Sequence, residues 1–185
     1  MKATSRRCAN CRKKCDAQEA IVSTLKAFCS YECLKEFSAK ERRKERTKQD
    51  KKTRERLKTK GQWTKEAQKA FNAYIRARDR NMPCISCGVA QTDEANKFDA
   101  GHYRSTGSAP HLRYNLLNCF AQCKKCNRWL SGNVANYRRH LISRIGLSRV
   151  EALEADQDIR NFDIAYLKRI KSIFTKKCKL IEKKC

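Results

Sequence analysis

The stretch that decides the fold runs from Cys84-Ile-Ser-Cys87 to Cys123-Lys-Lys-Cys126-Asn127. Two Cys-x2-Cys pairs, with 35 residues between Cys87 and Cys123, supply four thiolates, the ligand set of a closed structural zinc site. A zinc site of this kind lets a short segment fold around the metal without a large apolar core. We therefore predict a small domain stabilised by a zinc ion bound to these four cysteines.

The insert between the two cysteine pairs carries residues suited to chemistry. It contains Asp99-Ala-Gly-His102, and Asn127 directly follows the last cysteine. Histidine is the usual general base near neutral pH, and carboxylate and amide oxygens suit a hard cation such as Mg²⁺ or Mn²⁺. The pattern predicts a second, working metal ion held by Asp99 and Asn127. Arg104 and Arg113 are near enough in sequence to clamp phosphate oxygens.

The composition indicates a nucleic-acid partner. Lys and Arg number 44 against 19 Asp and Glu, a formal net charge of +25 on 185 residues. Contact with a phosphate backbone would release counterions and give strong, salt-dependent affinity. No stretch approaches the ~20 apolar residues of a membrane span, and we expect no signal peptide. We therefore expect a soluble cytoplasmic protein, with its 12 cysteines serving as metal ligands rather than in disulfides.

A second set of paired cysteines lies near the N-terminus. Cys8 and Cys11 are followed by Cys29 and Cys33, which we predict to form another zinc module over residues 1–36, with Ser30 capping a helix. Cys15 competes for a ligand place because three residues separate it from Cys11.

A charged run follows this module. Residues 35–60 hold 13 Lys or Arg and 5 Asp or Glu, without an apolar face. They predict a solvated helix or arm that serves as a spacer, a phosphate-tracking surface, or both. The basic residues expected on DNA here are Arg42, Arg43, Lys44 and Arg46.

The remaining sequence predicts helices around two short strands. An apolar stripe predicts a helix over 63–80 with Thr64 as its N-cap. Strand candidates are 97–104 and 112–117, and helices are expected from near Cys126, over 134–145, and after an Asp163 cap. The last helix repeats apolar residues at alternating three and four, broken by Lys171, which fits packing on the same chain or a homodimer contact.

At these motifs a family resemblance emerges. A histidine on a strand between two Cys-x2-Cys pairs, with Asn118 before and Asn127 after the second pair, resembles the HNH (ββα-metal) endonucleases over 84–132. The zinc-bearing form is similar to the endonuclease VII-like resolvases of branched DNA. CISCG, FDAGHYRS, LRYN, QCKKCN, LSGN and LISRIG resemble the NinG (Rap) recombination proteins of lambdoid phages over nearly the whole chain. This resemblance implies a structure-specific endonuclease acting on Holliday junctions and D-loops in a bacterial host cell, alongside phage or host recombination proteins.

The resemblance also implies roles for individual residues. His102 matches the general base, Asn118 the asparagine that orients it through the loop, and Asn127 a metal ligand. Related sites carry an acidic ligand directly before the base, where this chain has Gly101. Asp99 and Gly101 point the same way on a regular strand, ~6–7 Å apart, so Asp99 replaces that ligand only if the strand bulges. His111 is a further candidate, although a surface histidine with its hydrogen bonds satisfied is the preferred interpretation there.

We therefore predict a mostly helical α+β chain. A small N-terminal zinc module (1–36) and a long basic helix or linker (37–62) precede an HNH-type domain with flanking helices (63–160) and a C-terminal helix (161–185). The predicted function is metal-dependent cleavage of branched DNA. The alternatives are a zinc-finger accessory protein that binds branched DNA without cutting it and an RNA-binding protein, for which Trp129 and Tyr137 are the candidate stacking residues.

Overall fold

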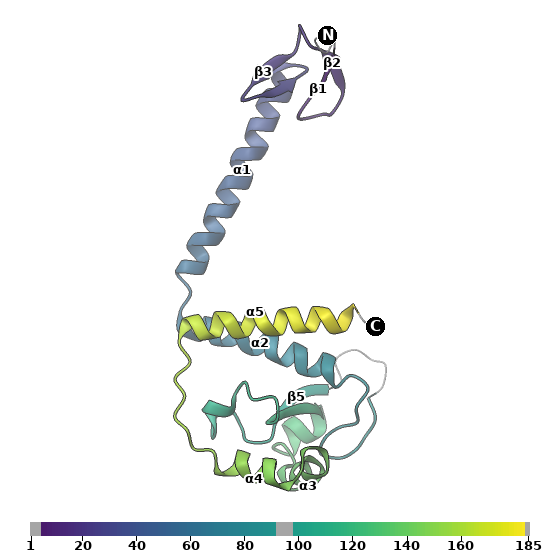
Figure 1. The fold of residues 1–185 in the computed structure, drawn as a ribbon, viewed down its shortest axis with the longest axis vertical. Helices are drawn as coiled ribbons and strands as arrows, with labels where there is room; N and C mark the ends of the chain where they lie inside the picture. The colour runs from purple at the N-terminus through teal and green to yellow at the C-terminus, as the bar shows by residue number, and fades with distance from the viewer. Residues whose placement is uncertain (1–4, 92–97, 184–185) are drawn as a thin grey trace. The chain divides into compact units, whose positions relative to one another are not determined.

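Two short β-hairpins and one long helix form the N-terminal part of the chain (Figure 1). The computed structural model describes residues 5–91 and 98–183, and the chain divides into two compact units, Met1–Lys58 and Thr59–Cys185. In the first unit, β1 (Ser5–Arg7) pairs antiparallel with β2 (Lys14–Asp16), and β3 (Ile21–Ser23) pairs with β4 (Lys26–Phe28). The β3–β4 loop is only Thr24-Leu25, and both residues have positive φ, as a tight hairpin of this twist requires.

Helix α1 (Tyr31–Arg56) begins directly after the second hairpin. Its predicted cap is confirmed, because the Ser30 side chain accepts a hydrogen bond from the Cys33 amide. None of the helix residues is buried. The helix therefore lacks an apolar stripe and depends on residue propensity and on pairs such as Lys44–Glu41, whose charged atoms lie 2.8 Å apart.

Two parallel helices that pack along each other organise the second unit (Figure 1). Helix α5 (Ile164–Glu182) lies along α2 (Lys60–Arg78) (Figure 1). The shared core contains Trp63, Ala67, Phe71, Ile75, Leu167, Ile170 and Phe174. Asp163 caps α5 as predicted, and Lys171, which breaks the apolar repeat, pairs with Glu66 at 2.9 Å. The apolar face of the last helix is thus used within the same chain.

Helix α2 starts earlier than predicted. Its N-cap is Thr59, whose hydroxyl accepts from the Gln62 amide while the Gln62 side chain accepts from the Thr59 amide. Thr64 lies inside the helix and bonds the Lys60 carbonyl. The prediction of Thr64 as the cap was wrong because Gly61 is accommodated in the first turn, where a glycine costs little.

A two-stranded sheet packs against α2. Strand β5 (Phe98–His102) pairs antiparallel with β6 (Cys119–Cys123) in unbroken register from Phe98 opposite Cys123 to His102 opposite Cys119. The second strand is therefore 119–123, and the predicted strand at 112–117 was wrong. A 3₁₀ turn η1 (Pro110–Leu112) and an Asn115 side chain that accepts from the Leu117 amide at 2.9 Å make that stretch turn-rich instead.

A short helical turn and two helices complete the second unit. The π-helical turn η2 (Lys125–Trp129) follows β6, and α3 (Val134–Ile145) and α4 (Leu147–Ala155) follow in order. The expected helix over 134–145 is confirmed. These helices bury a second core containing Ile85, Leu112, Phe120, Tyr137, Leu141, Val150 and Leu153. Within the described residues, no helix combines the length and apolar character needed to cross a bilayer.

Candidate metal and nucleic-acid site

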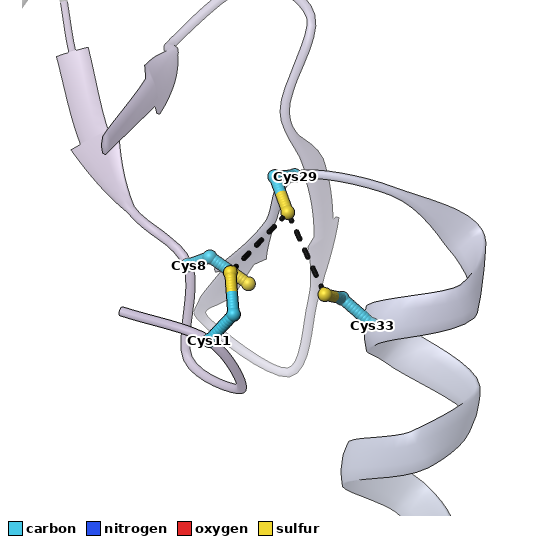
Figure 2. A group of neighbouring side chains, drawn as sticks. All are labelled: Cys8, Cys11, Cys29 and Cys33. Atoms are coloured by element: carbon cyan, nitrogen blue, oxygen red, sulfur yellow. Dashed lines mark hydrogen bonds between the residues drawn. The ribbon is translucent and has the colours of Figure 1, made fainter. Parts of the chain in front are cut away.

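The N-terminal unit gathers four cysteines into one cluster. Figure 2 shows the side chains of Cys8, Cys11, Cys29 and Cys33 converging from the first loop, from the end of the second hairpin and from α1. The sulfurs of Cys11 and Cys29 lie 3.6 Å apart, and those of Cys29 and Cys33 lie 3.5 Å apart. Tetrahedral zinc with Zn–S bonds of ~2.3 Å requires sulfur separations of ~3.8 Å, so this cluster can hold a zinc ion.

The competing ligand Cys15 lies outside that cluster. It sits on β2, and its thiol donates to the Arg6 carbonyl at 3.5 Å. The four-cysteine set predicted from the two pairs is therefore the one that the fold brings together.

The second unit contains the matching cluster of Cys84, Cys87, Cys123 and Cys126. The sulfurs of Cys87 and Cys123 are 3.8 Å apart. The Cys123 amide donates to the Cys84 sulfur at 3.3 Å, and the Cys126 amide donates to the Cys123 sulfur at 3.4 Å. Zinc binds the thiolate form of cysteine, and these amides lie where they can donate to zinc-bound sulfur.

His102 lies at the end of strand β5, opposite Cys119 of β6. Its Nε2 lies 2.9 Å from the Arg113 carbonyl oxygen, and its ring stacks on Phe71 of α2 with centroids 6.0 Å apart. The Nδ1 atom lies 3.7 Å from the thiol sulfur of Cys119, a weak donor. Burial lowers the pKa of His102 below its ordinary value, although the hydrogen bond to the Arg113 carbonyl opposes this. The ring is therefore neutral at neutral pH.

Asn118 ties together the loop between the two strands. It is fully buried, and its Oδ1 accepts from the Arg104 amide at 2.9 Å. Its Nδ2 donates to the carbonyls of Arg104 at 3.0 Å and Leu112 at 3.4 Å. Asn118 thus bonds the carbonyl of Leu112, the residue directly before Arg113, whose own carbonyl faces His102.

Asn127 and Asp99 meet where η2 passes β5. The Asn127 amide donates to the Asp99 carboxylate at 3.0 Å, and the Arg128 guanidinium donates to both carboxylate oxygens at 2.8 and 3.1 Å. Burial alone would raise the pKa of Asp99, but these hydrogen bonds outweigh it and lower the pKa. Asp99 is therefore an anion at neutral pH, with its charge balanced by Arg128.

The expected bulge at Gly101 is absent, because β5 pairs residue for residue with β6. The need for a glycine at position 101 has a different explanation. A Cβ at Gly101 would lie 2.1 Å from the Oε1 atom of the buried Gln122 side chain. Gly101 thus admits the neighbouring strand's side chain, and Asp99 contacts Asn127 from an undistorted strand.

A hollow of about 610 Å³ opens beside these residues. His102 and Asn127 both line it, together with Arg104, Glu154, and the hydroxyl-bearing residues Ser105, Thr106, Ser108 and Ser131. Glu154 was missed by sequence reasoning because α4 brings it in from far along the chain. It accepts hydrogen bonds from Tyr103 and, at 2.8 and 3.1 Å, from Arg138, and these partners lower its pKa.

The two arginines expected to clamp phosphate are partly engaged elsewhere. Arg104 donates from Nη1 to the carbonyls of Leu153, Glu154 and Asp156, so it caps the end of α4 while lining the hollow. Arg113 donates to Gln68 and to the Thr106 carbonyl, each at 3.3 Å. Arg104 therefore lines the hollow, whereas Arg113 bonds the carbonyl of Thr106, a residue of its lining.

Asp99, His111 and the predicted arm residues are not among the residues that line the hollow. The prediction of a surface position for His111 was wrong, because the side chain is buried; its Nε2 lies 2.9 Å from the Asp156 carbonyl, which gives it a structural role. The arm residues are on α1 and are all exposed: Arg42, Arg43, Lys44 and Arg46.

Comparison with known proteins places the chain in a family. A family model described as "Bacteriophage Lambda NinG protein" matches residues 1–184. The chain belongs to the NinG family. It is 41% identical to "Protein ninG" of Escherichia phage lambda, covering 91% of this chain and 92% of that protein, and 38% identical to "Protein ninG" of Salmonella phage P22, covering 91% and 93%. No solved structure matches the chain.

Proposed function

We propose that this protein is a metal-dependent endonuclease that cuts branched DNA during phage recombination. The observation that carries the proposal is the joint placement of His102 and Asn127 in one hollow, with Asn118 locking the loop that holds His102. This is the arrangement implied by the resemblance to HNH enzymes. The net charge of +25 supplies the affinity for phosphate that such an enzyme needs.

The hydrogen bonds of His102 support Nδ1 as the atom that acts as the base. A carbonyl oxygen only accepts, so the Nε2 that faces the Arg113 carbonyl carries the proton. The lone pair then lies on Nδ1, whose thiol neighbour is too weak a donor to occupy it. With its pKa lowered by burial, His102 is a free base at pH 7 and accepts the proton of an attacking water.

Asn127 and Asp99 carry oxygen atoms that suit a hard divalent cation, and Asn127 lines the hollow together with His102. Asn127 donates its amide hydrogen to Asp99, which leaves Oδ1 as a ligand atom, and Asp99 supplies the carboxylate that Mg²⁺ or Mn²⁺ prefers. A bound ion there would stabilise the negative charge that develops on the cleaved phosphate. The half-exposed Arg128 guanidinium pairs with Asp99 and is free to move aside when a cation takes over that charge.

The test is cleavage of a synthetic four-way junction by the purified protein. We expect cutting with Mg²⁺ or Mn²⁺ and none without added divalent ion. His102→Ala should reduce the rate by about 10²–10⁴ and leave junction affinity unchanged, because binding rests on the distributed basic surface. His140→Ala provides a matched control. His140 lies on α3, where its ring contacts the Ile85 carbonyl, and it does not line the hollow.

A second candidate is an accessory protein that binds branched DNA without cutting it. Gly101 occupies the position before the base where related enzymes carry an acid, and Asp99 is already neutralised by Arg128. These two features favour this candidate. It predicts tight junction binding with no metal-dependent cutting by the wild-type protein.

A further inference from the structure

One large aromatic side chain stands out on the surface beside the hollow. The chain has two tryptophans, of which Trp63 is 4% exposed in the core and Trp129 is 78% exposed. Within the described part of the chain, Trp129 forms no ring stack and lies under no cation. Its neighbour Leu130 is also 48% exposed. An isolated tryptophan in water carries a large apolar surface that a partner can cover.

The backbone beneath Trp129 is held on two sides. Cys126 of the second cysteine cluster and Arg128, which grips Asp99 of β5, lie on the same turn η2 as Trp129. The turn is closed by the Leu130 amide on the Lys125 carbonyl at 3.0 Å and by the Gly132 amide on the Cys126 carbonyl at 2.9 Å. The indole therefore projects from a fixed base.

The segment after Trp129 is strained. Ser131, Gly132 and Asn133 have successive φ values of 47°, 89° and 45°, a left-handed conformation that side-chain-bearing residues rarely adopt. Backbone strain of this kind persists where the surrounding structure enforces it and concentrates at functional sites. Ser131 and Gly132 also line the hollow, so the strained segment joins Trp129 to the proposed cutting site.

Charge around Trp129 suits a nucleic acid. Asn127, two residues before it, lines the hollow, and the exposed basic residues of the same turn are Lys124, Lys125 and Arg128. A strand whose phosphate lies in the hollow would carry its neighbouring bases past the indole. Every base has a flat face that stacks on an aromatic ring. In an intact duplex, however, those faces are covered by the adjacent base pairs.

We propose that Trp129 stacks on an unpaired or splayed base at the branch point and so selects branched DNA over linear duplex. The inference rests on the proposed function, because it names the DNA feature that the same site recognises. The zinc knuckle then has two tasks: it presents Asn127 to the phosphate and Trp129 to the base. A duplex offers the phosphate but no open base face, and it binds through charge alone.

Intrinsic fluorescence tests this directly, without added Mg²⁺ or Mn²⁺ so that no DNA is cut. The probes are a four-way junction and a linear duplex of the same total length. We expect the junction to quench wild-type emission more than the duplex does, and Trp129→Phe to lose that excess, which assigns it to residue 129 while Trp63 and its core stay untouched. Trp129→Ala should weaken junction binding about 10-fold or more, with duplex binding unchanged and Trp129→Phe intermediate.

Ile159→Ala is the matched control, since Ile159 is fully exposed on another segment and should have no effect. Zinc content equal to that of the wild type shows that the variants fold. The inference is overturned if duplex and junction quench equally, or if Trp129→Ala weakens both DNAs alike or neither. Quenching by the junction without any cutting in Mg²⁺ would reject the nuclease but keep Trp129 as the branch reader. Cutting without junction-specific quenching would keep the nuclease and reject Trp129 as the branch reader.

Discussion

The most informative single change is Asn118→Ala. The side chain is fully buried and makes three hydrogen bonds, from the Arg104 amide and to the carbonyls of Arg104 and Leu112. Leaving a buried polar group without a partner costs about 1–3 kcal/mol. Since two of the three bonds go to one residue and water can enter the space left behind, we expect a loss of about 3 kcal/mol in the free energy of unfolding of the second unit.

The matched control is Asn115→Ala in the same loop. Asn115 accepts one hydrogen bond, from the Leu117 amide, and is only partly buried, so its loss should cost about 1 kcal/mol. Urea unfolding at constant zinc, followed by the emission of the buried Trp63, measures both losses. Asn118→Ala should also slow junction cutting at least 10-fold below Asn115→Ala, because the Arg113 carbonyl no longer holds His102. Equal losses of stability and rate in the two variants would refute the role given to Asn118.

Four further predictions concern metals, charge and pH. Metal analysis should return about two zinc ions per chain. Cys29→Ser should lower the zinc content to about one, whereas Cys15→Ser should leave it at about two. A wild-type value near one would show that the N-terminal cluster does not hold zinc. Asp99→Asn should raise the Mg²⁺ concentration for half-maximal cutting with zinc content unchanged, and an unchanged Mg²⁺ requirement would make Asp99 a structural partner of Arg128. Burial lowers the pKa of His102, so the neutral base form persists even when the pH falls to the ordinary histidine pKa. Cutting should therefore decline only below about pH 6.5. A decline centred above that pH would exclude His102 as the base. Four basic residues of α1 can be changed to Gln together: Arg42, Arg43, Lys44 and Arg46. The slope of log affinity against log salt should become shallower by up to about 4, for duplex and junction alike. Selective loss of junction binding would instead make α1 the element that recognises the branch.

The parts of the fold set by short-range chemistry were predictable from the sequence. Ser30 and Asp163 cap helices because their hydroxyl or carboxylate reaches an amide three residues on, which is a local requirement. The paired spacing of the cysteines likewise predicted both clusters that the fold assembles. The cap of α2 was predicted at Thr64 but lies at Thr59, because either threonine satisfies the same local rule.

Features that depend on contacts between distant residues could not be predicted from the sequence. Gly101 suggested a bulge, but its real constraint is contact with Gln122 on the neighbouring strand. Glu154 enters the hollow only because α4 folds back over the loop after β5, and Arg104 is tied to the end of that same helix. No local pattern marks such contacts, since they arise from packing between segments about 50 residues apart.

The central claim is that the hollow between β5 and η2 cuts branched DNA with His102 as its base. The measurement that tests it most directly is the single-turnover rate of four-way-junction cleavage in Mg²⁺ by the wild type and by His102→Ala, with junction affinity measured for both. The account predicts metal-dependent cutting that falls about 10²–10⁴-fold in the variant at equal affinity. Undiminished cutting by His102→Ala, or no cutting by a zinc-loaded wild-type protein that binds the junction, would contradict it.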